Sequence, residues 1–372
     1  MNDTTKEKDV LNLWFNNIDS IGDITKRKLL AGLGSIENIY EASYEILCDI
    51  IGSEKSRIIK NNMSMGYAEE LRDILYEKRI DIVYPNHSDY PAKLLDIYDP
   101  PLILYVKGIL SKNLNIYNMN VGIVGARKAG VYGRELAEKI SFELAEKGIN
   151  IISGLALGID GRAHKGALLA GGYTVGVLGC GIDIIYPREN YDLYNEIVNK
   201  GAIVSEYGPG TAPNPGLFPI RNRIISGLSD GLVVVEAMKK SGSLITADMA
   251  LEQGKQVYSI PGRITDKNSE GTNNLIKQGA FLVSSSKDII DDLFGKADSV
   301  KEEGDDKEEV NKNYLAPAEK MLYSCLSLEP VYIDDIIEKL RIGVSETISL
   351  LYNMEEKGLI KQPIKGYYII SI

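Results

Sequence analysis

The segment from Phe218 to Leu228 carries two arginines one residue apart, Arg221 and Arg223, just upstream of an apolar run. A buried guanidinium group needs an anionic partner, because an unpaired buried charge costs several kcal/mol. A polyanionic ligand would supply that partner, so the segment is predicted to hold phosphate groups. The alternative is a pair of arginines that lie at the surface or form salt bridges within the protein.

Glycine, arginine and hydroxyl residues also gather in the segments that follow other apolar runs. In an open parallel sheet the carboxyl ends of the strands meet at one edge, and ligands bind there. Glycines let backbone amides approach a phosphate, and a following helix offers its N-terminus. The residues predicted to form a phosphate site at this edge are Gly125, Ala126, Arg127, Lys128, Ser153, Gly154, Arg188, Phe218, Arg221, Asn222, Arg223, Ser241, Gly242 and Ser243.

The motifs of common nucleotide enzymes are missing from the sequence. It contains no G-x-x-x-x-G-K-[ST], which argues against P-loop hydrolysis, and the first loop has Ala126 and Arg127 where the dinucleotide fingerprint needs glycine. Asp160 and His164 suggest a base with Ser153, but no nucleophile elbow accompanies them. We favour a structural role for the pair, as a helix-start cap and a structural contact.

Cysteine and histidine are too few and too scattered for metal chemistry. Cys48, Cys180 and Cys325 show no C-x-x-C spacing, and His87 and His164 are the only histidines. A disulfide framework, a zinc site or a transition-metal centre is therefore not expected, and no cofactor is predicted.

Charge and hydropathy limit the class of protein further. The 372 residues carry a net charge of −10, which argues against coating nucleic acid through a general basic field but leaves room for a local basic patch. The first residues are polar with mixed charge, and no apolar run approaches the length of a membrane span. A cytoplasmic protein is the expectation.

The elements that must position the predicted site alternate in type. Apolar runs without strict alternation, separated by helical patterns, indicate a parallel sheet covered on both faces, which is an α/β, extended Rossmann-like, doubly wound fold. Short runs bounded by proline between Tyr84 and Gly108 are predicted to extend an edge of this sheet. The expected strands are Val121–Val124, Ile151–Ser153, Thr174–Leu178, Ile203–Ser205, Leu232–Val235, Gln256–Ile260 and Phe281–Val283.

Smaller regions are predicted on both sides of this domain. The expected boundaries are a helical domain at 1–70, the Rossmann-like domain at 80–294, an acidic linker at 295–313 and a winged-helix domain at 314–372. Ile21–Ile24 resembles the hairpin of a helix-hairpin-helix or SAM-like module, although many small helical bundles contain such a turn. The winged helix rests on three helical patterns and a hairpin, with Ser345 as an N-cap and Gly358 after the last helix.

An ordered set of motifs resembles the DNA-processing protein A family, also called DprA or Smf. The matching residues are Gly125–Arg127, Ser153–Gly154, Gly158–Asp160, His164, Gly181–Asp183, Tyr186–Pro187, Ser205–Tyr207, Phe218–Leu228, Ser241–Ala247 and Gly271–Asn273. The resemblance implies a dimer without established catalytic activity that binds and protects single-stranded DNA. It also implies that the protein helps to load the RecA recombinase during natural transformation or DNA uptake.

The resemblance also implies roles for single residues. Arg127 would grip DNA phosphates from the first loop, Arg188 would do the same after Tyr186–Pro187, and Arg221 and Arg223 would line the rim of the same pocket. Tyr186, Tyr207 and Phe218 are candidates for stacking on bases, although each is more often a packing residue.

The C-terminal region departs from a basic DNA-binding module. Glu346, Glu355 and Glu356 fall on the candidate recognition helix, where they oppose phosphate binding. This region is therefore expected to contact protein, or to contribute little to DNA affinity.

Two other functions compete with DNA binding. One is a nucleotide phosphoribohydrolase of the lysine-decarboxylase-like group, which uses a related Rossmann pocket; its P-G-G-x-G-T loop is absent, and Glu236 near Ser241–Ser243 is a poor substitute for it. The other is a transcription factor built on the C-terminal region, which would require sequence-specific duplex binding.

Overall fold

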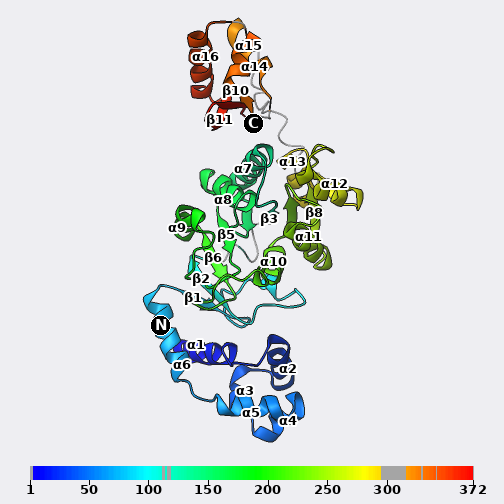
Figure 1. The fold of residues 1–372 in the computed structure, drawn as a ribbon. Coiled ribbons are helices and arrows are strands. Elements are labelled where there is room, and N and C mark those ends of the chain that lie inside the picture. The colour runs from blue at the N-terminus through cyan, green and yellow to red at the C-terminus, as the bar shows by residue number, and fades with distance from the viewer. Residues whose placement is uncertain are drawn as a thin grey trace.

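The computed structural model describes residues 3–110, 114, 119–294, 316–327, 330–340 and 342–371. The predicted acidic linker at 295–313 lies outside the described residues. Figure 1 shows the N-terminal helices in blue at one end of a central sheet flanked by helices. These helices are α1 (Asp3–Asn16), α2 (Asp23–Leu33), α3 (Ile36–Glu41), α4 (Tyr44–Ile51), α5 (Ser53–Asn61) and α6 (Gly66–Glu77).

Helix α6 runs past residue 70 to Glu77. Ala68, Leu71 and Leu75 on one of its faces are buried. The buried face of α6 belongs to an apolar cluster that also contains Trp14 of α1 and Tyr105 of the central sheet. The helical region and the sheet therefore share one continuous core.

A sheet of nine strands forms the centre of the molecule. Its order is β1-β2-β6-β5-β4-β3-β7-β8-β9, and the strands from β6 to β9 pair in parallel. The strands are β1 (Asp81–Val83), β2 (Leu104–Gly108), β3 (Asn120–Val124), β4 (Asn150–Ser153), β5 (Thr174–Val177), β6 (Ala202–Ser205), β7 (Gly231–Val234), β8 (Gln256–Ser259) and β9 (Phe281–Leu282). The seven predicted strands are thus confirmed to within one residue at every end.

The first two strands form the predicted edge extension. Strand β1 pairs antiparallel with β2, and β2 pairs antiparallel with β6. The strand order reverses between β3 and β7, where a doubly wound sheet has its ligand crevice.

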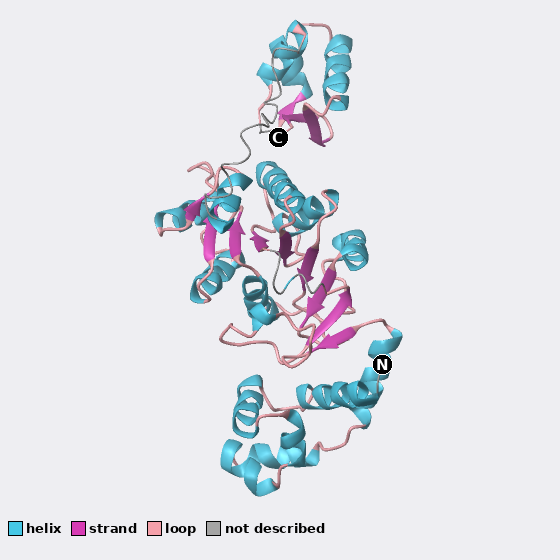
Figure 2. Cartoon of the chain, turned by 180° about the vertical axis from the view of Figure 1, so that it is seen from behind, coloured by secondary structure: helices cyan, strands magenta, loops and turns pink. Residues whose placement is uncertain are grey.

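Helices cover both faces of the sheet, as Figure 2 shows from behind. One apolar cluster joins α7, α8 and α13 to one face, and another joins α10 and α11 to the opposite face. This two-sided burial explains why the strands lack polar alternation. The helices after β3 are α7 (Val131–Glu146), α8 (Ile159–Leu169), α9 (Tyr191–Lys200), α10 (Leu217–Leu228), α11 (Gly242–Glu252), α12 (Glu270–Lys277) and α13 (Ser286–Phe294).

The C-terminal region combines three helices with a small antiparallel sheet of order β10-β12-β11. Its elements are α14 (Pro317–Cys325), β10 (Val331–Tyr332), α15 (Ile333–Leu340), α16 (Val344–Glu356), β11 (Ile360–Ile364) and β12 (Tyr367–Ile370). The predicted N-cap Ser345 is wrong, because Gly343 in an extended conformation is the N-cap and the helix begins at Val344. Gly358 follows the helix with a φ of 70°, as expected for its C-terminal position.

Candidate nucleic-acid interface

Arg221 is buried at the carboxyl edge of the sheet, with 4% of its surface exposed. Its Nη1 donates to the carbonyl of Gly154 at 2.9 Å and also to the carbonyl of Val177, while Nε donates to Asn222 Oδ1 at 3.2 Å. Helix α10 thus reaches under the ends of β4 and β5. Burial lowers the pKa of Arg221 to about 10, against the opposing effect of Asp160, so the side chain stays charged at neutral pH.

Gly154 allows Arg221 and Asp160 to meet. A Cβ atom at Gly154 would lie 2.7 Å from Arg221 Nη2 and 2.7 Å from Asp160 Oδ2. Burial raises the pKa of Asp160, and Arg221 and the backbone amides of Ala156 and Gly154 oppose this rise. The protein itself therefore supplies an acid, Asp160, beside the buried guanidinium of Arg221.

An aromatic ring joins three segments above this buried layer. The Cζ atoms of Arg127 and Arg221 lie 5.1 Å and 5.9 Å from the centre of the Phe218 ring, within the range of cation–π attraction. Tyr186 stacks on Phe218 at 5.7 Å with an interplanar angle of 29°. A Cβ at Gly179 would lie 2.7 Å from Phe218 Cδ1, so glycine makes room for the ring.

The outer side chains of this group face solvent. Arg127, Lys128 and Arg188 are exposed, Tyr186 is 41% exposed, and Phe218 is half-buried. We call these five residues the basic edge surface. The loops after β3 and β5 and the first turn of α10 therefore present three cations and two aromatic rings at one edge.

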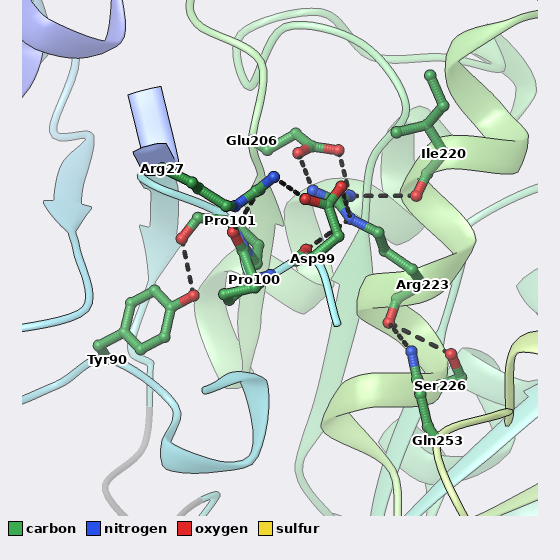
Figure 3. A network of polar contacts seen from close by, with 10 residues as sticks. All are labelled: Arg27, Tyr90, Asp99, Pro100, Pro101, Glu206, Ile220, Arg223, Ser226 and Gln253. Atoms are coloured by element: carbon green, nitrogen blue, oxygen red, sulfur yellow. Dashed lines mark hydrogen bonds and ion pairs between the residues drawn. The ribbon is translucent and has the colours of Figure 1, made fainter. Parts of the chain in front are cut away.

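Arg223 has an internal partner, which corrects its predicted place on the same rim. Its Nη1 and Nη2 donate to the two carboxylate oxygens of Glu206 at 2.7 Å and 2.6 Å, and its Nε donates to the carbonyl of Asp99 at 2.9 Å (Figure 3). Residues two apart on a helix point in nearly opposite directions. Arg221 and Arg223 therefore leave α10 on different sides, and the salt-bridged alternative holds for Arg223.

The crevice between β3 and β7 contains a carboxylate of the protein. Glu236, 4% exposed, accepts from the amide of Gly130 at 2.9 Å and from Asn268 Nδ2 at 3.2 Å. Burial raises the pKa of Glu236, opposed by these hydrogen bonds. The amide of Gly130 at the start of α7 therefore already has an acceptor within the protein.

Other predicted residues have structural partners. Ser153 Oγ donates to the carbonyl of Ile123 at 2.6 Å, and Ser241 caps α11 by accepting from the amide of Ser243. A Cβ at Gly125 would lie 2.6 Å from Ile159, so this glycine serves the packing of the loop on α8.

Ala126, Asn222 and Gly242, which were also predicted for the site, make structural contacts as well. Ala126 is buried, and its carbonyl accepts from the amide of Ile159. Asn222 Nδ2 donates to the carbonyl of Gly242 at 3.4 Å and thereby joins α10 to the start of α11.

Asp160 and His164 have separate structural partners, but the predicted helix-start cap is wrong, because α8 follows Gly158 without a side-chain cap hydrogen bond. His164 Nδ1 lies 2.7 Å from Thr174 Oγ1, whose hydroxyl donates to the carbonyl of Ile151. Burial lowers the pKa of His164 to about 3, so the ring is neutral at pH 7. Within the described ranges no group of three or more histidine, cysteine or acidic residues is arranged to hold a metal ion.

Comparison with known proteins places this geometry in a family. The model of the family described as DNA recombination-mediator protein A matches residues 81–294, more than half of the chain. The chain belongs to the DNA recombination-mediator protein A family. The DNA processing protein DprA of Bacillus subtilis is 41% identical over 244 residues, which cover 64% of this chain and 80% of that protein. The DprA of Streptococcus pneumoniae is 45% identical over 202 residues, covering 54% and 70%.

Solved structures of DprA proteins share the fold. The Streptococcus pneumoniae DprA aligns with a TM-score of 0.68 at 34% identity and covers 76% of this chain and 96% of that one. The Helicobacter pylori DNA processing protein A, studied for its single-stranded DNA binding mode, aligns with a TM-score of 0.53 at 32% identity, covering 59% and 97%.

The sequence patterns do not predict the two acidic partners of Arg223. Glu206 belongs to a matching motif without a predicted role, and Asp99 lies 124 residues from Arg223 in sequence. Glu206 directly follows β6 at the carboxyl edge of the sheet, and that placement is a signal that it could pair with one of the two arginines. No comparable signal existed for Asp99.

Proposed function

We propose that this protein binds single-stranded DNA on the basic edge surface. What supports this most is the stack of Arg127 on Phe218 and of Phe218 on Tyr186, which puts a cation and aromatic faces side by side at an exposed edge. Proteins that bind single strands without sequence preference combine backbone-tracking cations with rings on which bases stack. Arg188 and Lys128 would add phosphate contacts, and Arg221 would support Phe218 from below.

The role that follows is that of a recombination mediator. In this proposal the protein acts in the cytoplasm, protects incoming single strands and helps to load the RecA recombinase during DNA uptake, in line with its family. It acts as a homodimer through apolar side chains exposed on α11 and β9, of which Leu251 and Leu282 are examples.

Among the helices that the structure describes, none is both long and apolar enough to cross a membrane. We propose that the C-terminal region is a winged helix that meets protein and not DNA, because Glu346, Glu355 and Glu356 are exposed on α16.

We propose no catalytic step. The phosphoribohydrolase alternative depends on Glu236, which is engaged with Gly130 and Asn268 at the start of α7. Release of free base from a nucleoside monophosphate, lost in Glu236→Gln, would revive the alternative.

Fluorescence anisotropy with labelled single-stranded and duplex oligonucleotides across a salt series tests the proposal. The expected result is preference for single strands with a steep salt dependence. Arg127→Ala should weaken binding by about tenfold and make the negative slope of log K against log salt shallower by about 0.7, the value for one phosphate contact on a single strand. Lys28→Ala, which removes an exposed cation of α2, is the matched control and should change neither quantity. Unchanged binding in Arg127→Ala would remove the basic edge surface from the proposal.

A further inference from the structure

Two carboxylates fasten the N-terminal helical region to the elements that carry the basic edge surface. Asp99 lies in the loop before β2, and Asp183 lies in the loop after β5. Neither contributes a group that could grip a phosphate, because both are acids. Each nevertheless connects a cation of the helical region to a segment that bears a proposed DNA-binding side chain.

Asp99 lies between two arginines from different regions (Figure 3). Arg27 of α2 forms an ion pair with Asp99 Oδ1 and donates through Nη2 to the carbonyl of Pro100 at 2.9 Å. Arg223 of α10 lies on the other side, with Nε 3.3 Å from Asp99 Oδ2. Asp99 thus joins helix α2 to helix α10.

Arg223 ties this link to the orientation of α10. Its guanidinium makes the two-point contact with Glu206, and such a fork fixes direction as well as distance. The same short helix carries Phe218 and Arg221 on its other side. A change at Asp99 therefore acts on the helix that places the aromatic ring of the basic edge surface.

Asp183 makes the second link. Lys78, directly after α6, lies 2.9 Å from Asp183 Oδ2, and the amide of Gly210 donates to Asp183 Oδ1 at 2.9 Å. Burial acts to raise the pKa of Asp183, but the hydrogen bonds from Lys78 and Gly210 outweigh it, so the pKa is lowered and the carboxylate stays charged. The same loop continues from Asp183 to Tyr186 and Arg188.

Isolated ion pairs at a surface contribute little to stability. These two differ because each carboxylate is shared between partners in different segments, and Arg223 is 7% exposed. The continuous apolar cluster that contains Trp14 and Tyr105 also packs the helical region against the sheet. This packing holds Arg27 and Lys78 within reach of Asp99 and Asp183.

We infer that the N-terminal helical region positions the DNA-binding side chains through Asp99 and Asp183, which are positioning residues and do not touch DNA. The inference rests on the proposed single-strand binding. The inference is distinguished by the direction in which DNA affinity should change when either acid is removed. Removing an acid from a protein that binds a polyanion should strengthen binding by electrostatics alone, whereas the loss of a positioning acid should weaken it.

The test compares four full-length variants in the same anisotropy assay. Asp99→Asn and Asp183→Asn remove the shared carboxylates, and both should weaken binding of a single-stranded oligonucleotide roughly three- to tenfold without changing the salt slope. The matched controls are Asp96→Asn in the same loop as Asp99, and Glu189→Gln beside Arg188. Both control acids are exposed, and both controls should bind as tightly as the parent or more tightly.

Two further measurements distinguish an unfolded variant, a wrong inference and a wrong proposed function. Fluorescence of Trp14, the single tryptophan and buried in α1, reports whether each variant is folded. Amide hydrogen exchange of residues 183–190 and 206–223 should rise in the two test variants, whatever the protein binds. Tight binding and unchanged exchange in both test variants, with a parent that binds single strands, would overturn the inference alone. A parent that fails to bind single strands, with exchange raised in the variants, would overturn the proposed function and leave the fastening intact.

Discussion

At the carboxyl edge of the sheet, glycine-rich loops support cations below the basic edge surface but hold a carboxylate in the crevice between β3 and β7. Below the basic edge surface, Gly154 and Gly179 make room for a guanidinium group and an aromatic ring. In the crevice between β3 and β7, the space beside Gly130 is filled by the carboxylate of Glu236, at the place where a doubly wound fold commonly receives a phosphate. A glycine-rich loop therefore shows that something approaches the backbone closely, and the approaching side chain decides whether an anion can bind.

A substitution at the buried layer of the basic side should have the largest effect. Arg221→Ala removes the hydrogen bonds to Gly154 and Val177 and leaves Asp160 buried beside a void. We expect the free energy of unfolding to fall by about 3–5 kcal/mol, measured by urea denaturation. Arg188→Ala, at an exposed position of the same edge, is the control and should change it by less than about 0.5 kcal/mol. A loss below about 1 kcal/mol for Arg221→Ala would mean that Asp160 needs no guanidinium partner.

The neutral histidine beneath the same side predicts a pH dependence. The pKa of His164 is about 3 in the folded protein and 6.5 in its ordinary state, so the unfolded chain binds one more proton between these values. Stability should therefore fall by up to about 1.4 kcal/mol per pH unit as the pH drops below about 6.5. The measurement is urea denaturation at pH 7, 6 and 5.

His164→Asn keeps a polar atom toward Thr174 and should remove this part of the pH dependence. His87→Asn, at a partly exposed position, should retain it. Equal slopes in the parent and His164→Asn would show that the buried ring already accepts a proton.

On the other side of the edge, Glu236→Ala tests whether the carboxylate is only a cap. Loss of the acceptor for Gly130 at the start of α7 should cost about 1 kcal/mol of unfolding free energy. Affinity for single strands should stay within about twofold of the parent, since loss of one structural carboxylate removes no phosphate contact. Glu236→Gln, which keeps an oxygen acceptor, should be less destabilised. If Glu236→Ala weakened binding as much as Arg127→Ala, the distinction between the two sides would be lost.

Deletion of residues 314–372 should have the smallest effect. The exposed acids on α16 oppose contact with phosphates, so affinity for single strands is expected to change by less than about twofold. Anisotropy titrations of the full chain and the shortened chain at matched salt would measure it. A tenfold loss would show that the C-terminal region joins the basic edge surface in holding DNA.

The sequence by itself determined the layout of the protein. Apolar runs without alternation, such as Val121–Val124, indicate a sheet covered on both faces, and they predicted seven strands correctly. The short runs bounded by proline predicted the edge extension. Rules of local geometry also predicted that Gly358 follows α16, because the left-handed backbone there favours glycine. Loop positions after the strands brought Arg127, Tyr186 and Phe218 to one edge, as the parallel topology requires.

Only the tertiary structure decided which charges are left for a ligand. Arg221 and Arg223 look alike in sequence, but Arg223 meets Glu206 and Asp99, while Arg221 lies under Phe218. Likewise, nothing local to Gly130 predicts that Glu236 will accept from its amide. A charge is neutralised by whatever opposite charge the fold brings within a few ångströms. That distance depends on the packing of segments far apart in the chain, which no local pattern records.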